Sequence, residues 1–242
     1  MNNSCLKKIV LATIISIISL SCDAKLARNT QQTNANATEK PQPEAEIDYG
    51  DLIIKAQSDY LMIPVNLTEP RKKDETNFNL SRYDTKYGKL SNIIFYHKPD
   101  GDTHLLLNKK AIINSFDLVE TKSAGKPNTR FWLYRILDQD TNGDKKLNER
   151  DAIIGYLSDL SGKNLQQITP NNTQIINWVV VSSQNAIFLK IIKDSDNDKK
   201  FTEKDQTNFV RVNLDKPEIG TEIISDQLEQ EVKKTTFDGT QN

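Results

Sequence analysis

Two twelve-residue acidic runs constrain this chain more than any other feature. DTNGDKKLNERD spans residues 140–151 and DSDNDKKFTEKD spans residues 194–205, and both place oxygen-bearing side chains at positions 1, 3, 5, 9 and 12. A hard cation such as Ca²⁺ takes about six to eight oxygen ligands, and a short loop supplies them only when such side chains recur at this spacing. The expected cofactor is therefore calcium.

The predicted metal ligands follow from these positions, with the backbone carbonyl of a lysine at position 7 of each loop. They are Asp140, Asn142, Asp144, Lys146, Asn148 and Asp151 in the first loop, and Asp194, Asp196, Asp198, Lys200, Thr202 and Asp205 in the second. The second loop has more carboxylates among its ligands, so charge favours it as the tighter site. Plain acidic turns are the competing interpretation, because Asp and Asn are ordinary turn residues.

Both runs resemble the EF-hand calcium loop, and more closely its dockerin-type form, in which Asp takes position 12. An apolar residue that braces such a loop stands at position 8 in both copies, as Leu147 and Phe201. The pattern departs at position 6, where Lys145 and Lys199 replace the usual Gly and must accept a positive φ or bend differently. We therefore expect weak binding, with a Kd on the order of 10⁻⁴ to 10⁻³ M.

The first loop also fits a second register. Asp138, Asp140, Asn142, Gly143 and Glu149 match it, with Gly at position 6 and Glu at position 12. This register ranks second because it would put a lysine at the apolar bracing position. It would also lose the alignment with the second loop.

The segments beside both loops have the composition of β-strands. Residues 131–137 and 152–160 flank the first loop, and residues 186–193 and 207–214 flank the second. All four are rich in β-branched and aromatic residues and lack a polar face at helical spacing. Each loop is thus predicted to form the tip of a β-hairpin rather than to join two helices.

Residues 131–224 resemble the WD40-like propeller repeat of the TolB type. The resemblance rests on GKNLQQITP at residues 162–170, followed by TQIINW at residues 173–178. Propeller blades repeat every 40 to about 55 residues, which matches the distance between the two loops. The expected fold class is all-β: an antiparallel meander, partial or small and propeller-like, with a short C-terminal helix.

Two further local predictions complete the fold. Residues 93–96 are expected to pair with residues 104–107 across the turn PDGD. The C-terminal helix is expected over residues 225–234, where Leu228 and Val232 lie one turn apart and Asp226 is the expected N-cap.

The N-terminus is organised as a secretory signal. A basic pair at residues 7–8 precedes an apolar run over residues 9–21, which is too short for a spanning helix, and Cys22 follows. The Ser-Cys pair ending at Cys22 resembles the bacterial lipobox, which implies cleavage before this cysteine and its lipidation. A plain signal peptide cut after Ala24 is the alternative. The expected localisation is the bacterial cell envelope, as a membrane-anchored lipoprotein of the periplasm or outer membrane.

Three regions are expected along the chain. Residues 1–21 form the signal peptide, residues 22–47 a disordered tether, and residues 48–242 a β-rich domain with both loops. The tether is polar and has no aromatic residue, so it cannot bury a core. Cys5 and Cys22 both lie in the targeting segment, and the domain therefore has no disulfide.

The expected function is a non-catalytic binding or assembly module in which the calcium ions are structural. A net charge of −1 gives no electrostatic case for nucleic acid, so the expected partners are the membrane, through the lipid anchor, and an envelope protein or glycan. The sequence has no serine elbow, P-loop or dinucleotide fingerprint, and no catalytic residue is assigned. A calcium-stabilised secreted hydrolase with unrecognised catalytic carboxylates is the alternative.

Five ring-bearing residues admit two interpretations. His97 and His104 flank the PDGD turn and could bind zinc, but strand residues beside a turn are favoured because a zinc site needs further ligands. Trp132, Tyr134 and Trp178 could form a ligand platform, but aromatic residues on strands are more often part of the core.

Overall fold

The computed structural model describes residues 46–68, 90–122 and 128–237. The chain divides into two compact units, Met1–Gln42 and Pro43–Asn242, and every described residue belongs to the second unit. The expected signal peptide, the lipidation site Cys22 and the tether up to residue 45 lie outside the described residues. Within the described part, no helix has the length and apolar character needed to cross a membrane.

Nine strands form sheet A, and the first of them starts at Glu46, inside the segment expected to be tether. They run in the order β1-β3-β4-β6-β7-β8-β9, with β2 against β3 and β5 against β4. The strands are β1 (Glu46–Tyr49), β2 (Ile53–Ile54), β3 (Tyr60–Thr68), β4 (Leu90–His97), β5 (Thr103–Leu105), β6 (Ile112–Thr121), β7 (Thr129–Leu137), β8 (Ile154–Ser158) and β9 (Gln166–Gln167).

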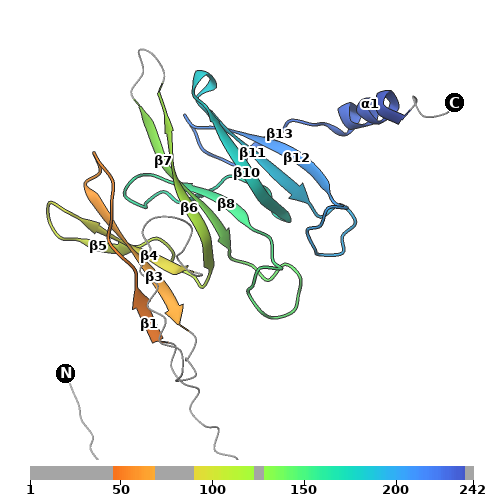
Figure 1. The fold of residues 1–242 in the computed structure, drawn as a ribbon. Helices are drawn as coiled ribbons and strands as arrows, with labels where there is room; N and C mark the ends of the chain where they lie inside the picture. The colour runs from red at the N-terminus through yellow and green to blue at the C-terminus, as the bar shows by residue number, and fades with distance from the viewer. Residues whose placement is uncertain (1–45, 69–89, 123–127, 238–242) are drawn as a thin grey trace, which may run out of the picture. The chain divides into compact units, whose positions relative to one another are not determined.

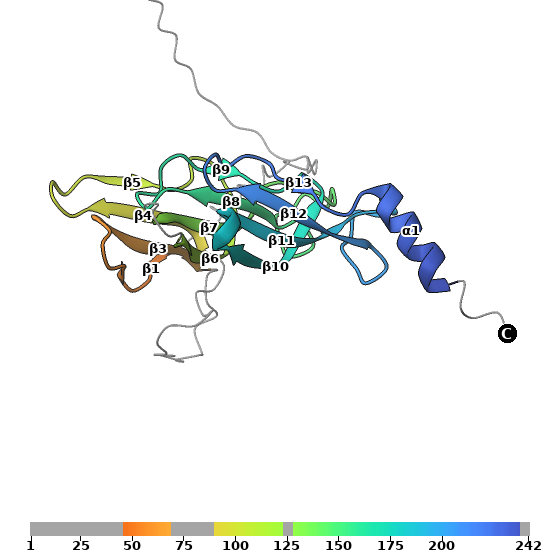
Figure 2. The same cartoon turned by 90° about the horizontal axis from the view of Figure 1, so that it is seen from above.

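Sheet B follows in the sequence and has four strands in chain order. They are β10 (Thr173–Val181), β11 (Ala186–Lys193), β12 (Gln206–Asn213) and β13 (Thr221–Glu222), with a 3₁₀ turn at Ser182–Gln184 between the first two. The chain ends in helix α1 (Asp226–Phe237), which extends beyond the strands in both views (Figures 1 and 2).

The core has two parts because β7 is buried on both faces. Successive side chains of a strand point to opposite faces. Trp132 and Tyr134 accordingly pack with Phe95 of β4, whereas Leu133 between them packs with Ile187 and other residues of sheet B. Strand β7 therefore reads as a continuous apolar run in the sequence, and it joins the two layers of the domain.

The expected fold class is confirmed. Every strand pair that the structure describes is antiparallel, and a single short helix follows the strands. Sheet B has the four strands of a propeller blade, whereas sheet A continues through nine, and neither sheet closes on itself. The predicted hairpin across PDGD is also present, with Phe95 opposite His104.

The expected N-cap of the C-terminal helix is wrong by one residue. Asp226 is the first helical residue, and the hydroxyl of Ser225 accepts the N–H of Leu228 at 3.2 Å. A cap must precede the helix so that its side chain can turn back onto the first free N–H groups. Ser225 meets this requirement. The carboxylate of Asp226 instead lies in the first turn, where its negative charge interacts favourably with the positive end of the helix dipole.

Candidate metal loops

Both acidic loops are the tips of β-hairpins, as predicted from their flanking segments. The first joins β7 to β8, whose last pair before the loop is Ile136 with Ile154. The second joins β11 to β12, which pair up to Lys193 and Gln206. The hairpin strands thus hold both ends of each loop close together. Both loops project from the lower end of their hairpins in Figure 1.

The carboxylate at position 1 of each loop accepts the backbone N–H of position 6. The distances are 2.7 Å from Lys145 to Asp140 and 3.1 Å from Lys199 to Asp194. Such a bond folds the chain around the carboxylate and leaves its remaining lone pairs for a cation. The other oxygen differs between the loops: that of Asp140 accepts the N–H groups of Gly143 (2.7 Å) and Asp144 (3.2 Å), whereas that of Asp194 has no hydrogen-bond partner among the described residues.

The side chains at positions 3 and 5 also accept backbone N–H groups, each from the residue two positions further along the chain. The side-chain oxygen of position 3 accepts the N–H of position 5, and that of position 5 accepts the N–H of position 7. The bonds run from Asp144 to Asn142 (2.8 Å), from Lys146 to Asp144 (2.9 Å), from Asp198 to Asp196 (3.1 Å) and from Lys200 to Asp198 (2.9 Å). Each of these side chains is thereby held against the backbone two residues further along the loop.

The aspartate at position 12 closes each loop. Asp151 is completely buried and accepts the N–H groups of Thr141 (2.9 Å) and Asn148 (2.8 Å), one on each oxygen. In the second loop the buried Asp205 accepts the equivalent N–H groups at 3.0 and 2.8 Å. Each closing carboxylate therefore ties positions 2 and 9 to the end of its loop.

A hydroxyl side chain at position 2 also bonds the closing aspartate in both loops. The sequence analysis did not predict this role. Thr141 donates to Asp151 (3.4 Å) and accepts the N–H of Ala152 (2.9 Å). Ser195 makes the same two bonds in the second loop, both at 3.2 Å. The available signal was the presence of a hydroxyl residue at position 2 in both runs.

Position 6 adopts the left-handed conformation expected from the loop pattern. Lys145 and Lys199 both have φ of 63°. Position 4 is also left-handed, with Gly143 at 78° and Asn197 at 59°. The left-handed region costs an ordinary L-residue roughly 1–2 kcal/mol, so each loop holds its lysine in a conformation that glycine would adopt more easily.

The hydrogen bonds of the first loop align with those of the second loop in the register that starts at Asp140. The other register needs the carboxylate of Asp138 as its first ligand. This carboxylate is buried and accepts hydrogen bonds from Lys109 Nζ at 2.5 Å and from the Tyr156 hydroxyl at 2.7 Å. Burial, reinforced by the bond to this carboxylate, raises the pKa of Tyr156. Both bonds use Oδ2 of Asp138, and its Oδ1 is buried without a hydrogen-bond partner among the described residues.

The second loop has the denser group of possible cation ligands. Oxygens of Asp194, Asp196 and Asp198 lie within 4.8 Å of one another, and in the part of the chain that the structure describes no other group of three acidic, histidine or cysteine side chains does so. One of these atoms, Asp194 Oδ1, is buried without a hydrogen-bond partner. A buried acceptor without a donor fits the coordination of a cation.

No protein-family model, curated protein or solved structure matches this chain.

The two histidines have separate partners. His97 Nδ1 bonds Asp100 at 2.7 Å, and His104 Nε2 bonds the carbonyl oxygen of Ser161 at 2.8 Å. His104 also stacks on Phe95, with the ring centroids 5.5 Å apart. This arrangement matches half-buried strand residues beside a turn.

The three aromatic residues near the loops lie in or against the core. Trp132 and Tyr134 are buried, whereas Trp178 is partly buried and lies 5.3 Å from the guanidinium of Arg135. The hydroxyl of Tyr134 bonds that of Ser158 at 3.0 Å, and burial raises the pKa of this tyrosine. The core interpretation therefore holds for Trp132 and Tyr134.

Acid is expected to open the second loop. N–H donation from Thr202, and then from Ser195, holds the pKa of Asp205 below its ordinary value. The ionised carboxylate therefore contributes stability above the unfolded pKa of about 3.9, and this contribution is lost as the pH falls through the lower folded pKa. Amide hydrogen exchange, corrected for intrinsic rates, should show protection of Thr202 and Ser195 falling below about pH 4. Asp205→Asn, which does not titrate, should show no such step, and an identical step in this variant would refute the assignment.

Proposed function

We propose that this protein is a lipid-anchored protein of the bacterial envelope whose β-rich domain binds two calcium ions, one in each hairpin loop. The ions are structural, and the domain serves as a non-catalytic module that binds an envelope protein or a glycan. The observation that carries the proposal is the hydrogen-bond pattern that both loops share at positions 1, 3, 5 and 12. These bonds fold the backbone of each loop around oxygen-bearing side chains at the spacing that calcium requires.

Electrostatics explains what the ion would contribute. Three carboxylates within 4.8 Å of one another repel strongly when no cation lies between them. A divalent cation coordinated by Asp194, Asp196 and Asp198 removes this repulsion and links both ends of the turn. Because β11 and β12 form the middle of sheet B, a fixed loop between them stiffens that sheet.

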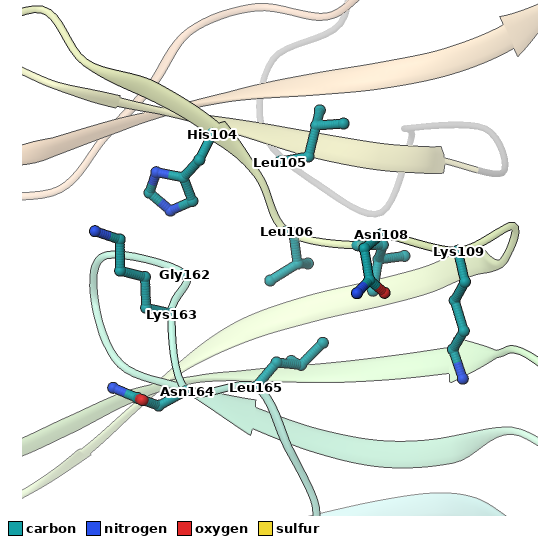
Figure 3. A pocket seen from close by; sticks show the side chains of 10 residues that line it. His104, Leu105, Leu106, Asn108, Lys109, Gly162, Lys163, Asn164 and Leu165 are labelled. Carbon is teal, nitrogen blue, oxygen red and sulfur yellow. The ribbon is translucent and has the colours of Figure 1, made fainter. Parts of the chain in front are cut away.

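The hydrolase alternative has less support. A pocket of about 400 Å³ lies between the end of β5 and the loop before β9 (Figure 3). Among the described residues, its polar lining comes from His104, Lys109, Lys163 and two asparagines and includes no carboxylate. A glycoside hydrolase needs a pair of carboxyl groups flanking the scissile bond. This pocket therefore gives no support to such an activity.

Calorimetric titration of the purified protein with CaCl₂ tests the metal proposal. We expect two ions per chain, with Kd values on the order of 10⁻⁴ to 10⁻³ M. Asp196→Asn with Asp198→Asn should remove the second site alone, and Asp140→Asn with Asp144→Asn the first site alone. These amide variants keep the shape of the loop and reduce its charge. An absence of binding at millimolar calcium would overturn the proposal.

Lipidation of Cys22 is tested by metabolic labelling in a bacterial host. The wild type should incorporate labelled palmitate and sediment with membranes, because the proposed lipobox makes Cys22 the acylated residue. Cys22→Ser should lose the label and leave the membrane fraction. Cys5→Ser is the matched control and should keep both properties. Label that persists in Cys22→Ser would contradict the anchor.

A further inference from the structure

The two loops contact each other, although they belong to different sheets. Lys199 of the second loop reaches the first loop, where its Nζ lies 3.7 Å from the point that a Cβ on Gly143 would occupy. A cavity of about 150 Å³ is lined by residues of both loops together with a residue that precedes β10. These residues are Thr141, Asn172, Asp194, Asn197, Lys199 and Phe201.

The backbone and the side chain of Lys199 serve different loops. Its N–H donates to Asp194 Oδ2 inside its own loop at 3.1 Å. Its ammonium makes no ion pair with a carboxylate in the described parts of the chain and lies instead against Gly143. Gly143 stands between the predicted ligands Asn142 and Asp144, so the positive charge is beside the first metal site.

We propose that Lys199 is an affinity-determining residue of the first loop, where its ammonium acts as a tethered cation that weakens calcium binding. This inference rests on the proposed calcium function. A fixed positive charge repels a divalent cation over distances within the Debye length of about 8 Å at physiological salt. The first loop also has fewer carboxylates, so both effects act in the same direction. The second loop consequently fills at lower calcium than the first, and the protein responds to calcium in two steps.

The test isolates the first loop in the full-length protein. Asp196→Asn with Asp198→Asn disables the second loop, and calcium is titrated by calorimetry with and without Lys199→Gln. We expect Lys199→Gln to tighten binding in the first loop about three- to tenfold at low salt. This gain should fall below about twofold in 0.5 M KCl, because salt screens the repulsion. Lys199→Arg keeps the positive charge, so the first loop of this variant should bind calcium as weakly as it does with Lys199 in place.

Lys145 provides the matched control, since it occupies the same position of the first loop and is exposed, as Lys199 is. With the first loop disabled by Asp140→Asn and Asp144→Asn, Lys145→Gln should change the affinity of the second loop less than about twofold. If Lys145→Gln raises calcium affinity as much as Lys199→Gln does, or if Lys199→Gln does not raise it, Lys199 does not weaken calcium binding by the first loop. If the wild type binds two ions while Lys199→Gln has no effect, only this inference fails. If the wild type binds no calcium, the proposed function fails with it.

Discussion

Asp151→Ala is expected to destabilise the calcium-free protein by about 2–4 kcal/mol, because three backbone N–H groups of the first loop, those of Thr141, Asn142 and Asn148, lose this acceptor. Asp151 is completely buried, and its oxygens accept the N–H groups of Thr141 and Asn148 at 2.9 and 2.8 Å. A donor that loses its partner in a buried position costs about 1–3 kcal/mol. Urea unfolding in EDTA measures the change in the free energy of unfolding.

Asp196→Ala is the control for this loss. Asp196 is exposed and accepts a single N–H, that of Asp198. Water can replace an exposed acceptor, so this substitution should cost less than about 1 kcal/mol. Asp151→Asn should lie between the two, because its carboxamide keeps one acceptor oxygen. Equal losses for Asp151→Ala and Asp196→Ala would show that the closing carboxylate does not hold the loop.

Removal of calcium is expected to lower the free energy of unfolding by about 3 kcal/mol. A ligand that binds only the folded protein stabilises it by RT ln(1 + [L]/Kd), which is about 1.4 kcal/mol for each site at free calcium ten times Kd. Two sites contribute about twice this amount when both are filled. Urea unfolding at about 10 mM calcium and in EDTA gives the difference. Magnesium should replace little of the effect, since it demands a smaller and more regular octahedral site.

The local structure of the loops could be predicted because the twelve-residue pattern determines it. The positive φ of Lys145 and Lys199 is one of the two outcomes that the loop pattern predicted for position 6. The hairpins follow from β-branched and aromatic runs on both sides of each loop, which pair as predicted. In these segments the neighbours in the sequence are also the neighbours in the structure.

Features that depend on distant contacts could not be predicted. Lys199 reaches Gly143 only because the two sheets pack together. Asp138 matched a ligand position in the sequence but bonds Lys109, from the connection between β5 and β6, and Tyr156 of β8. The division into two sheets has the same origin, since no local pattern indicates that β9 ends sheet A and β10 begins sheet B.

The melting temperature as a function of free calcium is the most direct measurement, with the wild type and Asp140→Ala/Asp194→Ala compared side by side. A stabilisation of about 3 kcal/mol predicts a rise of roughly 6–12 °C for the wild type, at 2–4 °C per kcal/mol for a domain of this size. The double variant lacks the first ligand of both loops and should show almost no rise. A wild type that melts at the same temperature in calcium and in EDTA, or a double variant that responds like the wild type, would contradict calcium binding by these loops.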